Sequence, residues 1–455
     1  MKKNIIVLGA GISGLSLSWF LKRKYGNRID IKIIEKSSRV GGWIQTQKMD
    51  GFLFEQGPRS CRTRGNGLET LKLIEELHLE DEVIAADPSA SKRYLYRDHR
   101  LVPLPSGFIS LFFSPFFKEI ARAAWHDWNT PKGSGEDESI YNFISRRFSP
   151  EIAEDFIDPL TTGIYAGDIR NLSILSCFPD LFNWEQTHGG IVRAILSNNK
   201  KEEQTLSPFI QSIKKHSIFT LKNGMETLPI ELAKQIQADV ILNSEVISLN
   251  MDKNKMEINL ANNSSCEADF IFSTLPASAL SKLLMKPSPF ATDILQSIPH
   301  ASIAVVNLGY KENVLDKSGF GYLIPSKEKE EVLGVVWDSC VFPQQQGQKH
   351  TCLTVMLGGM HNTEIETFDK QTLLQKALDV LAKQMNIKTP PAAAAVKLAC
   401  SAIPQFLVGH QRKLNALNRE ISHQLPFVTV HGNYLGVSVN DCIANSKTIS
   451  QNCNF

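Results

Sequence analysis

Apolar residues near the start of the chain follow two periodicities in turn. The continuous apolar run over residues 4–8 predicts a buried strand, and residues 15–24 have the apolar spacing of a helix. Between them residues 9–14 are rich in glycine, and a second strand is expected over residues 29–35. A strand, a glycine turn, a helix and a strand in this order predict a compact βαβ unit. A further amphipathic helix is expected over residues 68–79.

The pattern changes at about Pro88. From there to about residue 203, proline, aromatic and helical signals dominate. The lysine-rich stretch 198–204 has the composition of a solvated loop. This block is expected to be mostly helical and to be inserted into the domain that the first βαβ unit begins.

Strand patterns return in the second half of the chain. Together with the βαβ unit at the start, they predict an α/β fold. Strands are expected over residues 240–249, 256–260, 267–276, 301–309, 332–337 and 351–357, a helix over 370–385, and a strand, a glycine-rich turn and a helix over 427–447.

The composition is that of an ordinary folded protein. A length of 455 residues suffices for two or three domains, and 42% hydrophobic with 21% charged residues is usual for a globular chain. The formal net charge of +2 gives no reason to expect nucleic acid as a partner. The eight cysteines show no CxxC pair and no Cys/His ligand spacing, which favours a reduced intracellular compartment without zinc or disulfides. No apolar run approaches the roughly 18 residues that a membrane-spanning helix needs.

The glycine turn has the GxGxxG spacing of a dinucleotide-binding site and comprises Gly9, Ala10, Gly11, Ile12, Ser13 and Gly14. The first glycine permits the tight turn, the second lets the backbone approach a pyrophosphate, and the third allows the helix to pack closely on the strand. Glu35 ends the next strand, where a carboxylate would bind ribose hydroxyls. A plain glycine-rich turn in an ordinary α/β protein is the alternative interpretation.

Two further glycine segments favour FAD over NAD. Arg39-Val-Gly-Gly42 directly follows the acid, and a second glycine pair would let the backbone pass close to a long, extended cofactor. Gly432-Asn-Tyr-Leu-Gly436 precedes the last predicted helix, whose N-terminus would place a positive dipole end near the flavin pyrimidine. Each segment by itself could be a plain turn, and the first motif alone does not distinguish the two cofactors.

Longer segments of the chain resemble a known family, the oxygen-dependent, FAD-containing protoporphyrinogen oxidases. The resemblance extends from residue 2 to about residue 448, and its glycine motif is shared with amine oxidases and carotenoid desaturases. The segments over residues 304–308, 319–326 and 355–359 are more specific. The other matching segments are Val7-Leu-Gly-Ala-Gly-Ile-Ser-Gly-Leu15, Gly41-Gly-Trp-Ile44, Phe54-Glu-Gln-Gly-Pro-Arg59, Ser176-Cys-Phe-Pro179, Glu185-Gln-Thr-His188 and Val439-Asn-Asp-Cys-Ile443.

The resemblance implies a Rossmann-type FAD-binding domain, a substrate-binding domain around a mixed sheet, and an inserted helical domain that rests on a membrane surface. The expected bounds are 1–85, 213–279 and 410–455 for the first domain, 204–212 and 280–409 for the second, and 86–203 for the third. The FAD is expected to be bound non-covalently. Cofactor-binding positions are matched by Gly9, Ala10, Gly11, Ile12, Ser13, Gly14, Glu35, Lys36, Arg39, Gly42, Trp43, Gly57, Pro58, Arg59, Ser60, Val246, Gly432, Val437, Ser438 and Val439.

The resemblance also implies the reaction, which is the oxidation of protoporphyrinogen IX to protoporphyrin IX in tetrapyrrole biosynthesis. Six electrons leave in three hydride transfers to flavin N5, and dioxygen is the expected acceptor, which gives hydrogen peroxide. Because the cofactor carries the difficult step, no side chain is expected to act as a catalytic residue. The protein instead has to orient a broad apolar disc that carries two propionates.

The residues that match the family's substrate site are Arg93, Gly163, Gly321, Leu323, Val336 and Met356. The arginine is expected to pair with a propionate, the three apolar residues to form walls, and the two glycines to let the ring approach the backbone. Without the resemblance, the arginine reads as a surface residue and the apolar residues read as core positions. Thr162 stands where some members carry an arginine, so the placement of a propionate on that side stays open.

A poorly soluble tetrapyrrole favours a protein that attaches to a membrane surface, and the composition of the helical block suits such peripheral attachment. We therefore expect a cytoplasmic protein at the inner face of a bacterial cell membrane. A ferrochelatase-type neighbouring enzyme and a homodimer are further expected partners. Residues that could be interfacial, or else core or dimer contacts, are Phe108, Phe112, Phe113, Phe116, Phe117 and Trp125.

Three alternative functions stay open. A coproporphyrinogen III oxidase of the same fold would take a substrate with four propionates and would need more cations than Arg59 and Arg93. A flavin amine oxidase would present an aromatic pair to the flavin, and the C-terminal flavin segment shows none. A non-catalytic flavoprotein is disfavoured because the glycine motifs, Glu35 and both arginines are retained.

Overall fold

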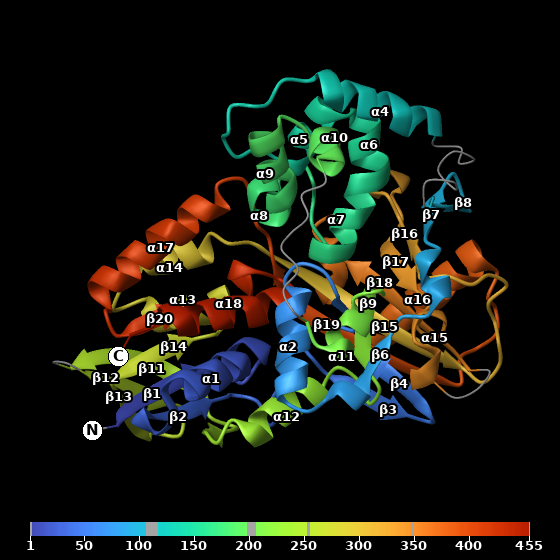
Figure 1. Ribbon diagram of the computed structural model, residues 1–455. Coiled ribbons are helices and arrows are strands. Elements are labelled where there is room, and N and C mark those ends of the chain that lie inside the picture. Colours follow the sequence, from blue (N-terminus) through green and yellow to red (C-terminus); the bar gives the residue numbers. More distant parts are fainter. Residues whose placement is uncertain (1, 106–116, 198–205, 253–254, 347–349, 455) are drawn as a thin grey trace.

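The computed structural model describes residues 2–105, 117–197, 206–252, 255–346 and 350–454 (Figure 1). Two large sheets and a group of helices make up these parts of the chain. The five-stranded sheet lies with both chain termini at one end of the molecule, and the helices formed by residues 117–196 lie above the seven-stranded sheet.

The five-stranded sheet is parallel throughout and is assembled from distant segments of the chain. Its strands in spatial order are β10 (Asp239–Ile241), β2 (Ile29–Ile34), β1 (Lys3–Leu8), β14 (Phe270–Ser273) and β20 (Val428–Val430). Helix α1 (Ile12–Tyr25) connects β1 to β2, which confirms the predicted βαβ unit. With β1 in the middle, the loops that follow β1 and β14 meet at the carboxyl edge of the sheet, where such sheets bind ligands.

The two faces of β1 are buried in different cores because successive side chains of a strand point to opposite sides. Ile5 and Val7 pack among helices on one face, whereas Ile6 and Leu8 pack on the other. The first face is covered by α1, α2 (Gly67–Glu76), α12 (Thr227–Gln235) and α18 (Val439–Asn452). The second face is covered by an antiparallel sheet of β11 (Val246–Asp252), β12 (Lys255–Leu260) and β13 (Ser265–Ala268), and by α13 (Ala277–Leu284), α14 (Pro289–Gln296) and α17 (His410–Gln424).

The seven-stranded sheet is mixed. Its order is β19 (Ala393–Pro404), β15 (His300–Tyr310), β18 (Thr351–Gly358), β17 (Val332–Val336), β16 (Gly321–Leu323), β7 (Tyr94–Arg97) and β8 (Arg100–Pro103). Only the β16–β7 pair is parallel among these. Helix α16 (Lys370–Met385) buries one face, which leaves the other face toward the helices of the middle block. The α/β fold class with a mixed second sheet is therefore confirmed.

Smaller elements connect the two sheets. Strands β3 (Thr46–Met49) and β4 (Phe52–Glu55) form a hairpin. A second small sheet has the order β5 (Cys61–Arg62), β9 (Ile218–Leu221) and β6 (Val83–Ala85). The short helices α11 (Pro208–Ile213) and α15 (Asp338–Val341) complete the connection.

The middle block is mostly helical, as predicted. Its core includes an ion pair that no water reaches, in which Arg147 Nε lies 2.6 Å from Asp127 Oδ1, while Arg147 Nη1 lies 3.2 Å from Glu185 Oε1. No helix among the described residues combines the length and the apolar run that crossing a bilayer requires. The helices are α4 (Phe117–Asn129), α5 (Ile140–Arg147), α6 (Pro150–Ile152), α7 (Asp158–Tyr165), α8 (Ile174–Cys177), α9 (Pro179–His188) and α10 (Ile191–Leu196).

The structure differs from the sequence-based expectations at several places. The strand expected over residues 267–276 is divided into β13 and β14, and β3, β4, β5, β6 and β9 were not expected. Residues 94–103, expected within the helical block, form β7 and β8 at the edge of the seven-stranded sheet. The single strand expected over 240–249 is two strands, because Asn243 adopts a left-handed backbone (φ 53°) between β10 and β11. Strand β19 was not expected at all. The stretch 198–204 and Phe108, Phe112, Phe113 and Phe116 lie outside the described residues.

Candidate active site

The first glycine turn packs so tightly that its third glycine cannot be replaced. Gly9 has a left-handed backbone (φ 100°), and its N–H donates to Ile34 O at 2.8 Å. A Cβ on Gly14 would overlap the carbonyl oxygen of Gly9, so only glycine lets α1 begin against the end of β1. A Cβ on Gly11 would meet nothing closer than Gly42 Cα at 3.9 Å. The space beside Gly11 is therefore open to a ligand, as the motif predicts.

The second glycine pair lies directly against the first. Gly41 N–H donates to Ala10 O at 2.8 Å, and Gly41 forms an isolated parallel bridge with Gly11. The Arg39 side chain stabilises this turn through two hydrogen bonds. Its Nη2 donates to Gly42 O at 2.6 Å, and its Nη1 donates to Ile44 O at 3.0 Å. In this structure the Arg39 side chain thus organises the turn, and a direct contact with the cofactor stays a prediction.

The Glu35 carboxylate lies at the end of β2 and joins two loops. Oε2 accepts the N–H of Ala10 at 2.8 Å, and Oε1 accepts the N–H of Ser37 at 2.8 Å. The Glu35 carbonyl oxygen accepts the N–H of Ser244, two residues before Val246 of β11. The predicted acid, Val246 and the glycine turn therefore lie around one end of the site. Lys36 points to solvent and pairs with Glu245 at 3.5 Å.

The N-terminus of α18 lies beside that of α1. Ser446 Oγ of α18 lies 2.9 Å from Ser16 Oγ and donates to Ser13 O at 3.0 Å. Ser438 caps α18 through a capping box with Asp441, whose backbone N–H donates to Ser438 Oγ at 3.1 Å. Two helix N-termini at one sheet edge favour negative charge, which suits both a pyrophosphate and a reduced flavin. The predicted residues Val437, Ser438 and Val439 form this second N-terminus, and Gly432 begins the short turn that precedes it.

The segment after β4 carries the arginine that joins the nucleotide end of the site to the second sheet. A Cβ on Gly57 would overlap Trp43 O, so these backbones are in close contact, and Pro58 follows. Arg59 Nη1 then donates to Asp338 Oδ1 at 2.8 Å, while Arg59 Nη2 is buried without a partner among the described residues. That free donor, together with a Trp43 side chain that is 40% exposed, fits a group lying in this turn.

Asp338 links Arg59 to polar residues of the seven-stranded sheet. Its Oδ2 accepts from Thr354 Oγ1 at 2.7 Å, and Thr354 Oγ1 also lies 2.8 Å from Asn307 Oδ1. Thr354 and Asn307 oppose each other on β18 and β15, so they point to the same face. A chain of buried polar groups therefore runs from Arg59 across the face of the sheet that α16 leaves uncovered.

A buried carboxyl lies beside this chain. Glu55 Oε1 accepts the N–H of Met225 at 2.7 Å and Oε2 accepts Thr46 Oγ1 at 2.9 Å. Burial nevertheless raises the pKa of Glu55 to about 7, because the two hydrogen bonds and the charge of Arg59 offset the lost hydration only in part. The group therefore changes its protonation near neutral pH.

The three predicted wall residues lie in one row across three neighbouring strands. In each of β16, β17 and β18 one residue alone is half-buried while every other residue of the strand is buried, and these are Leu323, Val336 and Met356. Leu323 and Met356 both pair with Gly334, so they share a face. Val336 pairs with Gly321 two positions along, on that same face. The three side chains of the row are therefore partly accessible from outside the protein.

Helix α7 lies against the strands of this row. A Cβ on Gly163 would lie 3.0 Å from Leu323 Cδ2, so the helix backbone approaches the wall closely. Gly321 has a left-handed backbone (φ 124°), and a Cβ there would overlap Val335 O. Thr162 is buried and donates to Asp158 O, so it offers no group to a ligand. Close packing thus requires glycine at position 321, whereas a side chain at position 163 would only require the end of the Leu323 side chain to shift slightly.

Arg93 lies at the edge of the same wall. Its guanidinium stacks over the ring of Phe320 at 5.2 Å and has no acidic partner among the described residues. Arg93 is exposed overall, although neighbouring protein atoms remove part of the hydration of its guanidinium. That burial, together with the charge on Arg62, lowers the pKa of Arg93. An arginine in this state is available to a carboxylate.

Comparison with known proteins gives the family. Residues 12–453 match the family of flavin containing amine oxidoreductases. A protoporphyrinogen oxidase from Bos taurus is 38% identical over 466 aligned positions, which cover 98% of this chain and 97% of that protein. The chain belongs to the flavin-containing amine oxidoreductases. This confirms the resemblance to protoporphyrinogen oxidases, and the chain is an FAD-dependent oxidoreductase.

Two further relatives place the chain within this flavoprotein family. A coproporphyrinogen III oxidase from Bacillus subtilis (strain 168) is 28% identical, covering 98% of this chain and 97% of that protein. The crystal structure of a candidate protoporphyrinogen oxidase from Exiguobacterium sp. 255-15 has a TM-score of 0.85 at 20% identity, covering 99% of this chain and 98% of that one. The second likeness supports the fold alone.

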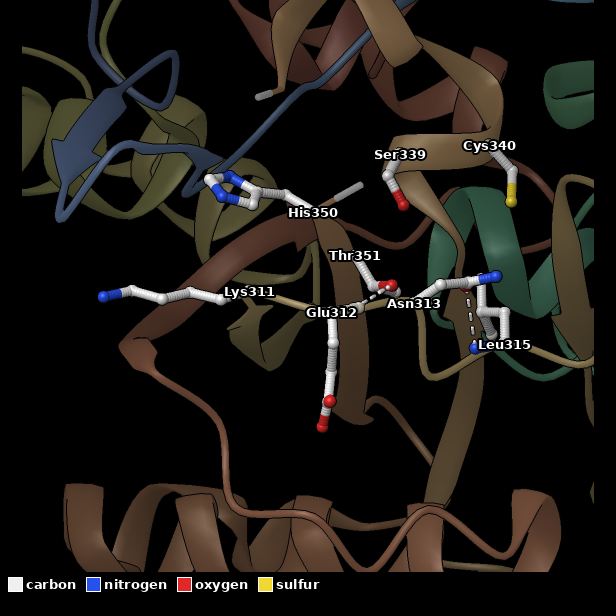
Figure 2. A pocket seen from close by; sticks show the side chains of 8 residues that line it. All are labelled: Lys311, Glu312, Asn313, Leu315, Ser339, Cys340, His350 and Thr351. Carbon is white, nitrogen blue, oxygen red and sulfur yellow. Dashed lines mark hydrogen bonds between the residues drawn. The ribbon is translucent and has the colours of Figure 1, made fainter. Parts of the chain in front are cut away.

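Figure 2 shows a separate surface hollow of about 570 Å³, lined by residues such as Lys311, Glu312, Cys340 and His350. None of the residues predicted for the flavoprotein's site lines it. Thr351 Oγ1 there donates to Glu312 O at 2.9 Å. The hollow therefore lies apart from the predicted site residues.

Sequence reasoning missed the polar residues that join the two halves of the flavoprotein. Asp338, Thr354 and Glu55 were not singled out, because their partners lie far away along the chain. Asn307 offered one usable signal, since it is the one polar residue in the predicted apolar strand 301–309 apart from Ser302. A buried amide in a strand requires a partner, and that requirement predicts a polar contact across the sheet.

The two glycines of the first turn should respond differently to alanine. Gly11→Ala should leave the melting temperature of the FAD-free protein unchanged, because φ is −74° and no atom obstructs the new Cβ, but it should weaken FAD binding about tenfold. Gly14→Ala should destabilise the FAD-free protein itself by about 1–3 kcal/mol. Thermal melts and flavin titrations measure both effects. An unchanged affinity for FAD in Gly11→Ala would contradict the assignment.

Glu55 should make stability depend on pH. Because the folded-state pKa of about 7 exceeds the ordinary value of 4.5, folded protein binds more protons in this window and loses stability as pH rises through it. With FAD in excess, the free energy of unfolding of wild type minus that of Glu55→Gln should fall by about 2–3 kcal/mol from pH 5 to pH 8. Urea denaturation of both proteins at each pH measures this difference in the free energy of unfolding. Glu267→Gln, at an exposed ion pair, should show no such slope.

Proposed function

We propose that this flavoprotein oxidises protoporphyrinogen IX to protoporphyrin IX in tetrapyrrole biosynthesis, with dioxygen as the electron acceptor. The observation that carries the proposal is the row of three half-buried apolar residues facing Gly163, with the unpaired Arg93 at its edge. A long apolar wall with a cation at its edge fits a broad disc with carboxylates at its rim. The full-length similarity to protoporphyrinogen oxidases supports the same substrate.

Each part of the FAD has residues that fit it. We assign the pyrophosphate to the turn of Gly9, Ala10, Gly11, Ile12, Ser13 and Gly14, and the adenosine end to Glu35, Lys36 and Val246. We assign the middle of the cofactor to Arg39, Gly42 and Trp43, and the flavin ring to Gly57, Pro58, Arg59, Ser60, Gly432, Val437, Ser438 and Val439. When bound, the flavin accepts hydrides from the substrate and delivers the electrons to dioxygen.

The protein's own residues orient the substrate and exclude water. Leu323, Val336 and Met356 would hold one face of the tetrapyrrole, and Gly163 lets the helix backbone approach its rim. Arg93 would pair with a propionate, which fixes the rotation of the disc within its plane. Because Arg59 is already neutralised by Asp338, it would act on the flavin side rather than on the substrate carboxylates.

The function is tested with purified protein that carries its flavin. Added without oxygen, protoporphyrinogen IX should bleach the flavin spectrum, and in air it should give porphyrin fluorescence together with hydrogen peroxide. Arg93→Gln should raise KM about tenfold or more, because a charge-assisted hydrogen bond to the substrate is lost. Coproporphyrinogen III should be oxidised more slowly. A preference for this four-propionate substrate, which the similarity to the Bacillus enzyme makes worth testing, would overturn the substrate assignment.

We further propose that the protein attaches peripherally to the cytoplasmic face of a membrane through α4 and α10. Trp125 is 72% exposed, Leu196 is 67% exposed and Ile195 is 63% exposed, so none of them is a core residue. The two helices pack together, and Arg193 stacks on the half-exposed Trp128 at 5.1 Å. Exposed aromatic and aliphatic side chains beside an arginine suit an anionic lipid surface. A ferrochelatase-type enzyme at that surface, and a second copy of the chain, are further proposed partners.

Attachment is tested by sedimentation with vesicles that contain phosphatidylglycerol. The double variant Trp125→Ser/Leu196→Ser should bind at least about tenfold more weakly than wild type, because it removes two apolar side chains that would be buried in the interface. Phe290→Ser, at a residue of α14 that is 55% exposed, is the matched control and should bind as wild type does. Equal binding by all three proteins would exclude this patch as the attachment surface.

A further inference from the structure

Arg62 lies on β5 and faces the substrate side of the molecule. Its cross-strand partner is Ile218 of β9, and the preceding pair is Cys61 with Phe219. Cross-strand partners share a face, and successive pairs alternate. Cys61 and Phe219 lie in the core beneath the parallel sheet, whereas Ile218 lies in a different apolar cluster. Arg62 therefore points to the side of that second cluster.

The second cluster ties Arg62 to the substrate wall. Ile218 packs there with Phe320 and with Val336, the middle residue of the half-buried row. Phe320 is also the ring on which Arg93 stacks at 5.2 Å. Arg62 on β5 and Arg93, the residue before β7, are thus both connected to one apolar cluster, Arg62 through Ile218 and Arg93 through Phe320.

The backbone of Arg62 is held rigidly near the flavin end of the site. Asn440 Nδ2, in the first turn of α18, donates to Arg62 O at 3.0 Å. A Cβ on Gly67 would overlap the same carbonyl oxygen, so α2 also packs directly on it. The arginine is therefore fixed at its base, and only its side chain is free to follow a ligand.

Both arginines keep an uncompensated charge. Neither has a salt bridge to an acidic side chain within the parts of the chain that the structure describes, in contrast to Arg59, which Asp338 neutralises. The charge on Arg62 lowers the pKa of Arg93, and it also reaches the phenol of Tyr165, two residues beyond Gly163. Two like charges that border one space repel each other, and a carboxylate between them relieves that repulsion.

We propose that Arg62 is a second carboxylate-binding residue of the substrate site, which together with Arg93 binds two neighbouring carboxylates on one edge of a dicarboxylate tetrapyrrole. This inference rests on the proposed function and deepens it. An apolar disc held by two guanidinium groups at one edge has a single favoured rotation in its plane. The pair therefore selects which carbon of the ring faces the flavin, although neither arginine touches the reacting atoms.

The test compares Arg62→Gln with Arg62→Lys, Arg93→Gln and the control Arg64→Gln, at an exposed arginine two residues further along. All should carry flavin and melt as wild type does. Arg62→Gln should raise KM for protoporphyrinogen IX about 10- to 100-fold with kcat nearly unchanged, the lysine variant should recover part of the loss, and Arg64→Gln should be unaffected. Both substrates are assayed in one detergent solution. For the dimethyl ester of protoporphyrinogen IX, which has no free carboxylates, wild type and Arg62→Gln should have equal KM values.

Binding without turnover separates this inference from the proposed function. The dissociation constant of protoporphyrin IX, measured by absorbance, should rise in Arg62→Gln by the same factor as KM, while that of its dimethyl ester should not change. If wild type binds the porphyrin in this way but oxidises no porphyrinogen, the proposed function fails and the role of Arg62 in carboxylate binding stands. Equal affinities of wild type and Arg62→Gln for the free acid, or an equal loss for the ester, would overturn the inference.

Discussion

The Arg59–Asp338 ion pair fixes the relation between the two halves of the site. Arg59 follows the glycine segment that packs on Trp43, and Asp338 follows β17, the central strand of the substrate wall. Exposed pairs such as Lys2–Asp30 contribute at most about 1 kcal/mol, whereas removing one partner of a pair as buried as Arg59–Asp338 costs several kcal/mol. The distance between the flavin turn and the wall is therefore set by a contact that is costly to break.

The same pair determines which cations are left for a substrate. The sequence alone assigned a propionate to Arg93 and assigned Arg59 to the cofactor, and in the structure Asp338 neutralises Arg59. Arg93 stays free, and the pairing of β5 with β9 brings Arg62 to the same wall. Two free arginines at one edge suit a tetrapyrrole with two carboxylates on that edge better than a tetrapyrrole with four carboxylates distributed around the ring.

The sequence predicted those parts of the fold that rest on local patterns. The βαβ unit, α16 and strands β15, β17 and β18 follow from periodicity, and the glycine turn follows from steric requirements that act over a few residues. Strand β19 could not be predicted in this way, since its run of alanines favours a helix and only pairing with β15 makes it a strand. The polar chain from Arg59 to Asn307 was equally hidden, because Arg59 and its partner Asp338 are 279 residues apart in the sequence.

The helical block joins the proposed membrane-facing helix α4 to helix α7 through buried contacts. Asp127 of α4 and Glu185 of α9 both bind Arg147 of α5, which no water reaches. Phe143 of the same α5 packs in one core with Tyr165, the last residue of α7. The helix that carries the exposed tryptophans and the helix that covers the wall are thus parts of one packed unit. The proposed attachment of α4 would therefore also fix the position of α7, and with it Gly163, relative to a lipid surface.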